Sequence, residues 1–354
     1  MRRLLLLLLP LAWIYDGIMR VRNALFDAGL LPSRRFGLPV IAIGNLAVGG
    51  TGKTPHAEYV LRLLATRCKP AVLSRGYGRR SKGFVKAEAN STADELGDEP
   101  FQMWQKFPAV TVAVDADRCE GISRLLTEKD APDVIVLDDA FQHRYVRAGL
   151  YVLLTDYHRL YTSDYVLPAG RLRESRRGAR RADVILVTKC PANLSPEACD
   201  NVRKRLSPLA GQQVLFTTFS YGAPYPLWPQ EVADYWAWKD REVLVITGIA
   251  NPEPLHRQVE AGGRVIPLTF PDHHAFSPAD IARLNAAFAS LPKGSIALTT
   301  EKDASRLRLV GDKLSPDLRA ALLVQPVEVA FLNHEDIAFN KTIIEYVTEN
   351  QTNG

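Results

Sequence analysis

The stretch LPVIAIGNLAVGGTGKTPH, residues 38–56, decides the fold of this chain. It opens as a short apolar strand, passes through a glycine-rich turn and enters the amphipathic segment PHAEYVLRLLATR, residues 55–67. A strand, a glycine-rich turn and a helix in that order are typical of a phosphate-binding loop. The usual spacing of such loops is G-x-x-x-x-G-K-S/T, and Ala47 stands where the first glycine would fall.

The loop carries the groups that a bound nucleotide requires. Its glycines lack Cβ atoms, so backbone N–H groups can converge on phosphate oxygens at the start of the helix. We expect Lys53 to contact the β- and γ-phosphates and the Thr54 hydroxyl to bind Mg²⁺. The loop residues predicted to bind the nucleotide are Gly49, Gly50, Thr51, Gly52, Lys53 and Thr54.

Further apolar stretches follow the loop, with helix-like segments between them. This alternation predicts an α/β fold of the phosphate-loop NTPase type, with a mostly parallel sheet and helices on both faces. Ligands of such sheets bind at the carboxyl ends of the strands. The other predicted strands of this sheet lie within residues 69–80, 109–118, 133–143, 150–156 and 182–190.

Length and composition indicate a globular protein of about two domains. The chain has 354 residues, of which 47% are hydrophobic and 23% charged. Its four cysteines are far apart and form no C-x-x-C pair, so we expect reduced thiols in an intracellular enzyme and no zinc site. We expect an N-terminal membrane-interface helix, a phosphate-loop domain, a linker rich in proline and aromatic residues, and a smaller C-terminal α/β domain, at residues 1–35, 36–219, 220–240 and 241–354.

The N-terminus carries a short apolar run that follows two basic residues. Arg2 and Arg3 precede the mostly aliphatic residues from Leu4 to Ile14. No A-x-A-like cleavage site follows, and the run is shorter than the ~20 apolar residues that a spanning helix needs. We therefore favour an interfacial helix whose apolar side enters the bilayer while nearby arginines face anionic headgroups. A helix packed on the protein's own core and a cleaved secretory signal are the alternatives.

Two segments at predicted strand ends bear on the metal and on the base of the nucleotide. The stretch DVIVLDDAFQH ends in acids, and phosphate-loop enzymes hold Mg²⁺ at such a strand end, so Asp138 and Asp139 are predicted metal residues. LVTKCP, residues 186–191, stands where guanine-specific proteins carry N-K-x-D. Pro191 replaces the carboxylate that would bind guanine, which favours ATP over GTP, and we expect Lys189 to contact the nucleotide.

Two other segments offer groups that could take the proton of an acceptor hydroxyl. ADELGDEPFQMW, residues 93–104, carries four acids in a turn before a helix, and TFPDHHAFSP, residues 269–278, carries an acid and two histidines. A solvated charged face and a surface histidine are the alternative interpretations. An Asp and a His from opposite domains that met at the γ-phosphate would form a hydrogen-bonded general base. The residues concerned are Asp94, Glu95, Asp98, Glu99, Asp272, His273 and His274.

PAGRLRESRRGARRAD, residues 168–183, is dense in arginine, which binds phosphate in a bidentate manner. A phosphorylated substrate, a membrane surface or nucleic acid could be the partner, and a solvated basic face is the remaining alternative. We do not expect nucleic acid, because no nucleic-acid motif accompanies the cluster and the net charge is only +5. The arginines are Arg171, Arg173, Arg176, Arg177, Arg180 and Arg181.

Taken together, these motifs resemble those of the tetraacyldisaccharide 4′-kinases, the lipid A kinases of bacteria with an outer membrane. IAIGNLAVGGTGKTP, SRGYGR, GDEP, VIVLDDAFQH, LPAGRLRE, VTK, GIANP, PDHH and TEKD occur in the family's order, up to about Asp303. The resemblance implies transfer of the γ-phosphate of ATP, with Mg²⁺, to the 4′-hydroxyl of a tetraacyl glucosamine disaccharide 1-phosphate. It also implies two α/β domains and a place on the cytoplasmic face of the bacterial inner membrane, and no obligate protein partner is evident.

The resemblance further implies roles for individual residues. Asp98 of GDEP would be the catalytic base, working with His273 of PDHH, and Lys53 would assist catalysis. The metal would be surrounded by Thr54, Glu99, Asp138 and Asp139. The residues expected near the lipid's sugar and phosphate or near the nucleotide phosphates are Asn45, Arg75, Tyr77, Gln142, His143, Arg171 and Arg173.

Two other functions fit a phosphate loop. A ligase of the dethiobiotin synthetase-like group would be expected to lack the leucine-rich opening helix. A membrane-associated nucleotide switch would hydrolyse ATP slowly without a phosphorylated product, and it would give Asp98 and His273 no role.

Overall fold

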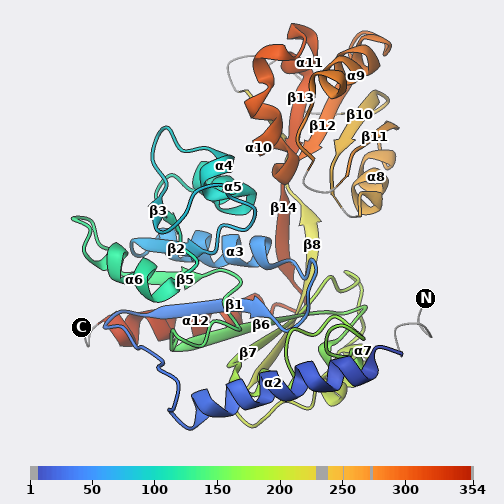
Figure 1. Ribbon diagram of the computed structural model, residues 1–354. Coiled ribbons are helices and arrows are strands. Elements are labelled where there is room, and N and C mark those ends of the chain that lie inside the picture. Colours follow the sequence, from blue (N-terminus) through green and yellow to red (C-terminus); the bar gives the residue numbers. More distant parts are fainter. Residues whose placement is uncertain (1–6, 229–237, 250, 272–273, 352–354) are drawn as a thin grey trace. The chain divides into compact units, whose positions relative to one another are not determined.

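A computed structural model describes residues 7–228, 238–249, 251–271 and 274–351. The chain divides into two compact units, whose elements are labelled in Figure 1. The larger unit comprises Met1–Phe219 and Val329–Gly354, and the smaller unit comprises Ser220–Glu328.

The larger unit is built on a nine-stranded sheet. Its strands are β1 (Val40–Asn45), β2 (Pro70–Ser74), β3 (Val85–Lys86), β4 (Thr111–Val114), β5 (Val134–Leu137), β6 (Leu150–Asp156), β7 (Val184–Thr188), β8 (Gln213–Tyr221) and β14 (Val327–Phe331). Their order across the sheet is β14-β8-β7-β6-β1-β5-β2-β4-β3. Pairing is parallel from β8 through β1 to β4, and β3 is antiparallel to β4. The carboxyl ends of the parallel strands therefore share one edge, with the phosphate loop's strand β1 beside β5.

Helices cover both faces of this sheet. They are α2 (Leu9–Asp27), α3 (Lys53–Ala65), α4 (Ala93–Leu96), α5 (Asp98–Lys106), α6 (Arg118–Leu126), α7 (Pro196–Leu206) and α12 (Asp336–Gln351), with 3₁₀ turns η1 (Tyr161–Ser163) and η2 (Arg176–Arg181). Because successive side chains of a strand point to opposite faces, Ile41 and Ile43 pack with α3 and α12, whereas Val40 and Ala42 pack with α6. The predicted fold class is confirmed.

The smaller unit holds a five-stranded sheet of order β11-β10-β12-β13-β9. Its strands are β9 (Tyr225–Pro226), β10 (Glu242–Thr247), β11 (Arg264–Thr269), β12 (Ile296–Thr300) and β13 (Leu322–Gln325). Its helices are α8 (Glu253–Glu260), α9 (Pro278–Ala289), α10 (Glu301–Leu309) and α11 (Pro316–Ala321), with the 3₁₀ turn η4 (Gly311–Lys313). Helix α9 begins with a capping box, in which the Ser277 hydroxyl accepts from the Asp280 N–H.

The C-terminal segment differs from the expected boundary, which gave all of residues 241–354 to the smaller domain. Helix α12 belongs to the larger unit, because its apolar stripe of Phe339, Ile343 and Val347 lies in the core with α3. The Tyr346 hydroxyl also donates to the carbonyl oxygen of Val40 in β1. This return of the chain depends on contacts between residues about 300 apart in sequence, which a local pattern does not reveal.

The expected linker, residues 220–240, also differs from a simple connection. Strand β9 within it pairs antiparallel with β13, and Leu227 is buried in the core of the smaller unit. Trp228 packs against the same core, so proline and aromatic residues here complete a sheet edge. Residues 229–237 lie outside the described residues.

Candidate active site

The phosphate loop connects β1 to α3 and needs glycine at particular positions. Gly52, the N-cap of α3, has a φ of 84°, in the left-handed region that glycine adopts at low cost. A Cβ at Gly52 would also lie 2.4 Å from Cζ of Phe219. Ala47, in contrast, forms a β-bridge with Leu172, so the missing first glycine falls where the backbone is extended. The departure from the usual spacing is therefore compatible with the loop.

Asp139 links the loop lysine to an arginine. Its carboxylate lies 3.8 Å from Nζ of Lys53 and accepts two hydrogen bonds from the Arg173 guanidinium, at 2.7 and 3.2 Å. Burial pushes the pKa of Asp139 upward, but Arg173 and Lys53 outweigh it and hold that pKa below its ordinary value. The φ of Asp139 is 46°, a left-handed conformation that a residue with a Cβ rarely adopts. The carboxylate is thus held ionised in one orientation.

Asp138, the adjacent acid, has the opposite electrostatics. It is 1% exposed, its Oδ2 accepts from the Ser74 hydroxyl at 3.3 Å, and its buried Oδ1 has no hydrogen-bond partner among the described residues. Burial, together with the charges of Glu99 and Asp139, raises the pKa of Asp138 to about 7. A divalent cation would relieve both the unpartnered oxygen and the crowding of carboxylates.

Two glycines bring the SRGYGR and GDEP turns together. A Cβ on Gly97, whose φ is 88°, would lie 2.9 Å from the carbonyl oxygen of Tyr77. A Cβ on Gly76 would lie 3.0 Å from the carbonyl oxygen of Leu96. The exposed Tyr77 and the residues that open α5 are therefore neighbours, although they are separated in sequence.

The predicted base Asp98 opens α5, with Glu99 next to it, and both are half-buried. Glu99 is close enough to Asp138 to raise its pKa, so it faces the same edge of the sheet. Asp98 and Glu99 are also in the first turn of α5, where the helix dipole favours negative charge. His273, the expected partner of Asp98, lies outside the described residues.

Three predicted substrate residues lie directly against the loop. The buried Asn45 side chain donates to the Thr51 hydroxyl at 2.7 Å, and its backbone carbonyl accepts from Gln142 at 2.8 Å. Arg173 donates to the Asn45 side chain as well as to Asp139. In this structure, Asn45 and Gln142 support the loop from beneath.

Arg171 and Lys189 also approach the loop. The carbonyl of Arg171 accepts from the Val48 N–H at 2.8 Å, and a Cβ on Gly49 would lie 3.9 Å from Nη1 of Arg171. Lys189 donates to the carbonyl of Gly50 and pairs with Asp156 at 2.9 Å. Arg171 is exposed beside the loop, whereas the Lys189 ammonium is occupied by loop backbone and an acid.

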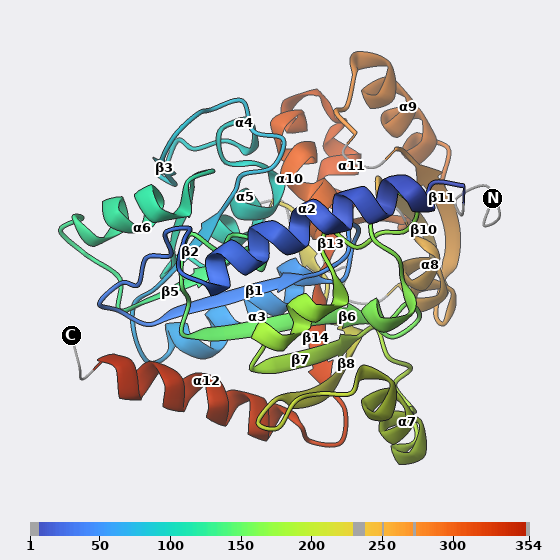
Figure 2. The same ribbon diagram turned by 60° about the horizontal axis from the view of Figure 1, so that its bottom comes forward.

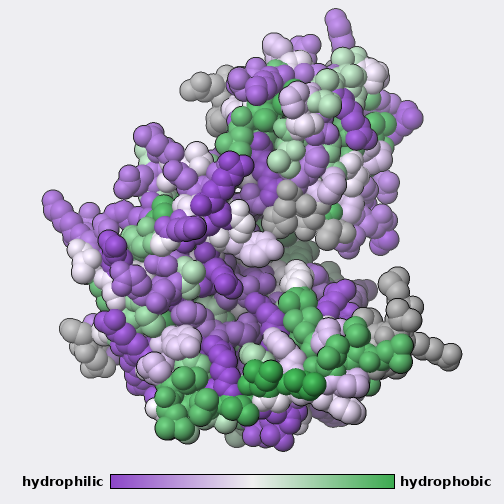
Figure 3. Space-filling view, viewed as in Figure 1, coloured by the Kyte–Doolittle hydropathy of each residue, from purple (hydrophilic) through white to green (hydrophobic). Residues whose placement is uncertain are grey.

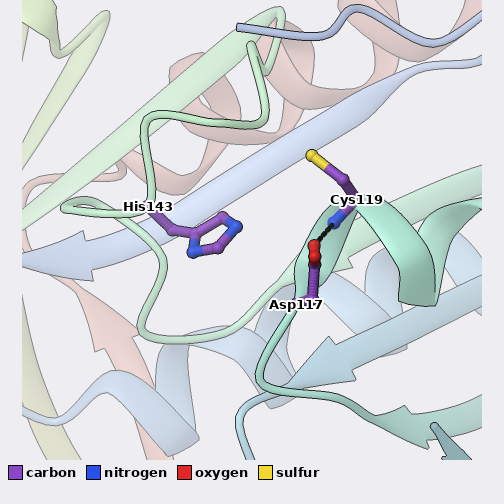
Figure 4. Close-up of side chains that lie close together, drawn as sticks. All are labelled: Asp117, Cys119 and His143. Carbon is purple, nitrogen blue, oxygen red and sulfur yellow. Dashed lines mark hydrogen bonds between the residues drawn. The ribbon is translucent and has the colours of Figure 1, made fainter. Parts of the chain in front are cut away.

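His143, another predicted substrate residue, faces the start of α6. Its ring lies near the Asp117 carboxylate and the Cys119 thiol, with one potential ligand atom of each within 4.8 Å of the others (Figure 4). The Asp117 carboxylate already caps α6, and the thiol donates to the carbonyl of Tyr145. Burial, and then the charge of Arg118, lowers the pKa of His143 to about 4. Because positive charge surrounds this cluster, we assign no metal to it.

The N-terminal helix α2 joins the site at one side and exposes apolar residues on the other. Tyr15 donates to the carbonyl of Arg173 at 2.9 Å, and Asn23 donates to the buried Glu174 at 2.7 Å. Figure 2 shows α2 as a rod across the outside of the unit, and Figure 3 shows a hydrophobic band along it. Its exposed large apolar residues are Leu11, Trp13, Ile14, Ile18 and Val21. No helix among the described residues is long and apolar enough to cross a membrane.

Comparison with known proteins identifies the family of this chain. The family model described as tetraacyldisaccharide-1-P 4′-kinase matches residues 4–347. The chain belongs to the tetraacyldisaccharide-1-P 4′-kinase family. The family and the kinase class predicted from the sequence are thereby confirmed.

Relatives of high similarity match nearly the whole chain. Tetraacyldisaccharide 4′-kinase of Bacteroides fragilis strain YCH46 is 48% identical over 98% of this chain and 94% of its own length. The protein of that name from Flavobacterium johnsoniae is 46% identical over 97% of each chain. The crystal structure of LpxK from Aquifex aeolicus in complex with ATP matches with a TM-score of 0.73 at 28% identity, over 97% of this chain and 99% of that one.

Three residues of the site escaped the sequence analysis. Arg118 is 3% exposed and close enough to Asp138 for their charges to interact, and its burial lowers its pKa to about 10. Glu174 is buried and accepts three hydrogen bonds from other side chains of the larger unit, two from Arg181 and one from Gln142, besides that from Asn23 of α2. The third residue, His56, lies under the loop. A charged residue that opens the helix shortly after a strand, as Arg118 does after β4, is a signal that could have been used.

Proposed function

We propose that this chain transfers the γ-phosphate of ATP to the 4′-hydroxyl of a tetraacyldisaccharide 1-phosphate. The observation that carries the proposal is the position of Lys53 of the phosphate loop beside the Asp138–Asp139 pair. A loop lysine beside two acids, in a chain of this kinase family, is the arrangement that binds a nucleoside triphosphate together with its metal ion. ATP is the proposed donor because the Aquifex aeolicus relative is solved in complex with ATP, and because Pro191 leaves no carboxylate for guanine.

Mg²⁺ fits the acids of this site. Asp138 offers a buried carboxylate oxygen that has no hydrogen-bond partner in the described part of the chain, whereas both oxygens of Asp139 are engaged by Arg173. We therefore assign Asp138 as the direct ligand, with Thr54 and Glu99 completing the set, and Asp139 as the acid that orients Lys53 and Arg173. When bound, the metal would neutralise negative charge that develops on the transferred phosphoryl group.

We assign Asp98 as the base that takes the proton of the acceptor hydroxyl. This carboxylate opens α5 at the sheet edge that carries Lys53, and it adjoins Glu99. A general base needs to accept a proton at an accessible position, and Asp98 is half-buried whereas Asp138 is enclosed. His273 remains its proposed partner on the strength of the PDHH motif.

Exposed cations and an aromatic residue are proposed to receive the substrate phosphates and sugar. Arg75, Tyr77 and Arg171 are exposed around the loop edge. Guanidinium groups bind phosphate through two hydrogen bonds, and a tyrosine ring offers a flat apolar surface to a sugar. His143, on the α6 side, would act as a neutral hydrogen-bonding group.

Helix α2 is proposed to bind the enzyme to the cytoplasmic face of the bacterial inner membrane, where an acylated acceptor would reside. Trp13 is 70% exposed and Ile14 is 63% exposed, on the side of α2 away from the site. Exposed apolar patches on a folded unit favour a membrane or protein surface, and an interfacial helix enters the headgroup region. The hydrogen bonds of Tyr15 and Asn23 would keep the docked helix next to Arg173 and Glu174.

A transfer assay tests the proposal. Purified full-length protein, γ-labelled ATP and Mg²⁺ are incubated with the tetraacyldisaccharide 1-phosphate in mixed micelles, and labelled lipid is expected. An acceptor that lacks the 4′-hydroxyl, and the Lys53→Ala variant, serve as controls without product. Absence of label in the intact acceptor would refute the kinase proposal, and hydrolysis of ATP in that case would favour a nucleotide switch.

A further inference from the structure

Three consecutive carbonyls of the phosphate loop accept hydrogen bonds from side chains. The carbonyl of Gly50 accepts from the Lys189 ammonium, and that of Thr51 accepts from the Thr188 hydroxyl at 2.9 Å. The carbonyl of Gly52 accepts from Nδ1 of His56 at 2.7 Å. Two of these donors lie at the end of β7, and the third lies in the first turn of α3.

These bonds determine where the loop's N–H groups point. A trans peptide is planar, so the carbonyl of one residue and the N–H of the next point in opposite directions. An anchored Thr51 carbonyl therefore sets the direction of the Gly52 N–H, and an anchored Gly52 carbonyl sets that of the Lys53 N–H. N–H groups at this point of a phosphate loop are those that bind phosphate oxygens.

The His56 ring can bond the Gly52 carbonyl in only one tautomer. Its side chain is 2% exposed, and burial lowers its pKa to about 4, so the ring is neutral near pH 7. Because the Gly52 carbonyl can only accept, Nδ1 carries the proton and Nε2 is the acceptor. The Thr217 hydroxyl in β8 lies 3.0 Å from Nε2 and can donate to it. Both ring nitrogens are thus satisfied inside the protein.

Strand β8 supports the same point from a second side. Thr217 and Phe219 are two residues apart, so their side chains share a face of the strand. Phe219 packs so closely against Gly52 that a Cβ there would overlap its ring, and its ring meets that of His56 at a centroid distance of 6.0 Å. The left-handed Gly52 is therefore enclosed by His56 and Phe219.

We propose that His56 is a positioning residue for the nucleotide, which holds the Gly52–Lys53 peptide so that its N–H faces the bound phosphates. The inference rests on the proposed ATP-dependent function, and it assigns a task to a buried histidine that does not take part in the chemistry. His56 is 2% exposed, so it would not touch the nucleotide itself. It acts through the Gly52 carbonyl and depends on the Thr217 hydroxyl for its tautomer.

Two variants of His56 separate its two hydrogen bonds. The amide nitrogen of asparagine can occupy the place of Nδ1, so His56→Asn keeps the donor to Gly52. The terminal amide of glutamine reaches the place of Nε2. His56→Gln therefore keeps a polar group near Thr217 but loses the donor to the Gly52 carbonyl. Leu64→Ala is the matched control, because Leu64 is buried in the same helix at its far end.

The measurement is the Kd for ATP with Mg²⁺ by calorimetry on the full chain, together with kcat and the KM values for ATP and lipid. We expect His56→Gln to weaken ATP binding about tenfold, the worth of one lost hydrogen bond, and to raise KM for ATP more than it lowers kcat. His56→Asn should lie within about threefold of the wild type, and the KM for lipid should change in neither variant.

The results distinguish this inference from the proposed function. If wild-type protein binds no ATP, the proposed function falls and the inference falls with it. If the wild type binds ATP and His56→Gln binds it equally well, only the positioning role is wrong. Equal weakening in His56→Gln, His56→Asn and Leu64→Ala would show a general loss of stability and would also overturn it.

Discussion

The loop edge of the large sheet and the outer face of α2 belong to one unit but are built on different physics. At the edge, Asp138 and Asp139 are adjacent acids whose pKa values shift in opposite directions because their neighbours differ. On α2, Ile14 and Ile18 are each more than 60% exposed and need no particular partner. Electrostatic contacts are directional, whereas apolar burial is additive and non-directional. A single substitution at the loop edge should therefore cause a large loss of activity, whereas substitutions on α2 should reduce membrane binding in proportion to the apolar area removed.

The largest effect is expected at the proposed base. Asp98→Ala should lower kcat by about 10²-fold or more, because the carboxylate proposed to accept the proton is lost. His273→Ala should do the same, because His273 is the proposed partner of Asp98. Asp94→Ala is the control, since Asp94 is exposed in the neighbouring helix α4, where its carboxylate pairs with Arg80. Near-normal turnover of both Asp98→Ala and His273→Ala would remove the pair from the mechanism.

Asp138→Asn should trade activity for stability. We expect turnover to fall about 10²-fold, because a proposed metal ligand is lost. Because the pKa of Asp138 is raised, the folded protein favours the protonated form of this side chain. The free energy of unfolding therefore decreases as the pH rises toward and through about 7. The metal-free variant should then unfold at a higher temperature than the wild type at pH 8 and at an equal temperature near pH 4. A lower unfolding temperature at pH 8 would contradict the assigned electrostatics.

On α2 the effect should scale with apolar area. Ile14→Ser and Ile18→Ser should each reduce partitioning onto anionic vesicles about tenfold, and the double variant should show the product of the two. The Kd for ATP should not change, because neither side chain faces the site. Co-sedimentation with vesicles measures the partitioning, with Asn23→Ala, on the docked side of the helix, as the control. Unchanged partitioning of the double variant would exclude this face as the membrane contact.

The smallest effect is expected for the stability of Asp139→Asn, and its sign is opposite to that of Asp138→Asn. The lowered pKa of Asp139 means that its ionised form stabilises the fold above the ordinary carboxyl pKa and that this contribution is lost as pH falls below it. The variant should therefore unfold roughly 3 °C lower than the wild type at pH 8. Thermal unfolding from pH 8 to pH 3 should show the difference vanish at the acidic end. An equal or raised unfolding temperature at pH 8 would show that Arg173 does not stabilise the acid.

Local sequence signals predicted the sheet, the loop and the acid pair, because each depends on residues that are close in the chain. The spacing of Gly52, Lys53 and Thr54 after an apolar run is such a signal, and so is the strand that ends at Asp138. The boundary of the second unit was misjudged because α12 carries an apolar pattern that fits either unit. Only its contacts with α3 and β1 assign it to the larger one.

Motif spacing and hydrophobic periodicity are properties of short segments, so the amino-acid sequence alone predicted a phosphate loop, an α/β fold and an apolar N-terminal helix. The kinase class came from the resemblance of the ordered motifs to one family. The tertiary structure alone decided which acid is ionised, since the pKa values of Asp138 and Asp139 depend on Glu99 and Arg173 from distant segments. It also decided what holds the loop. The tolerance of Ala47 and the role proposed for His56 both follow from neighbours in space, Leu172 and Thr217, that no spacing rule connects to the loop.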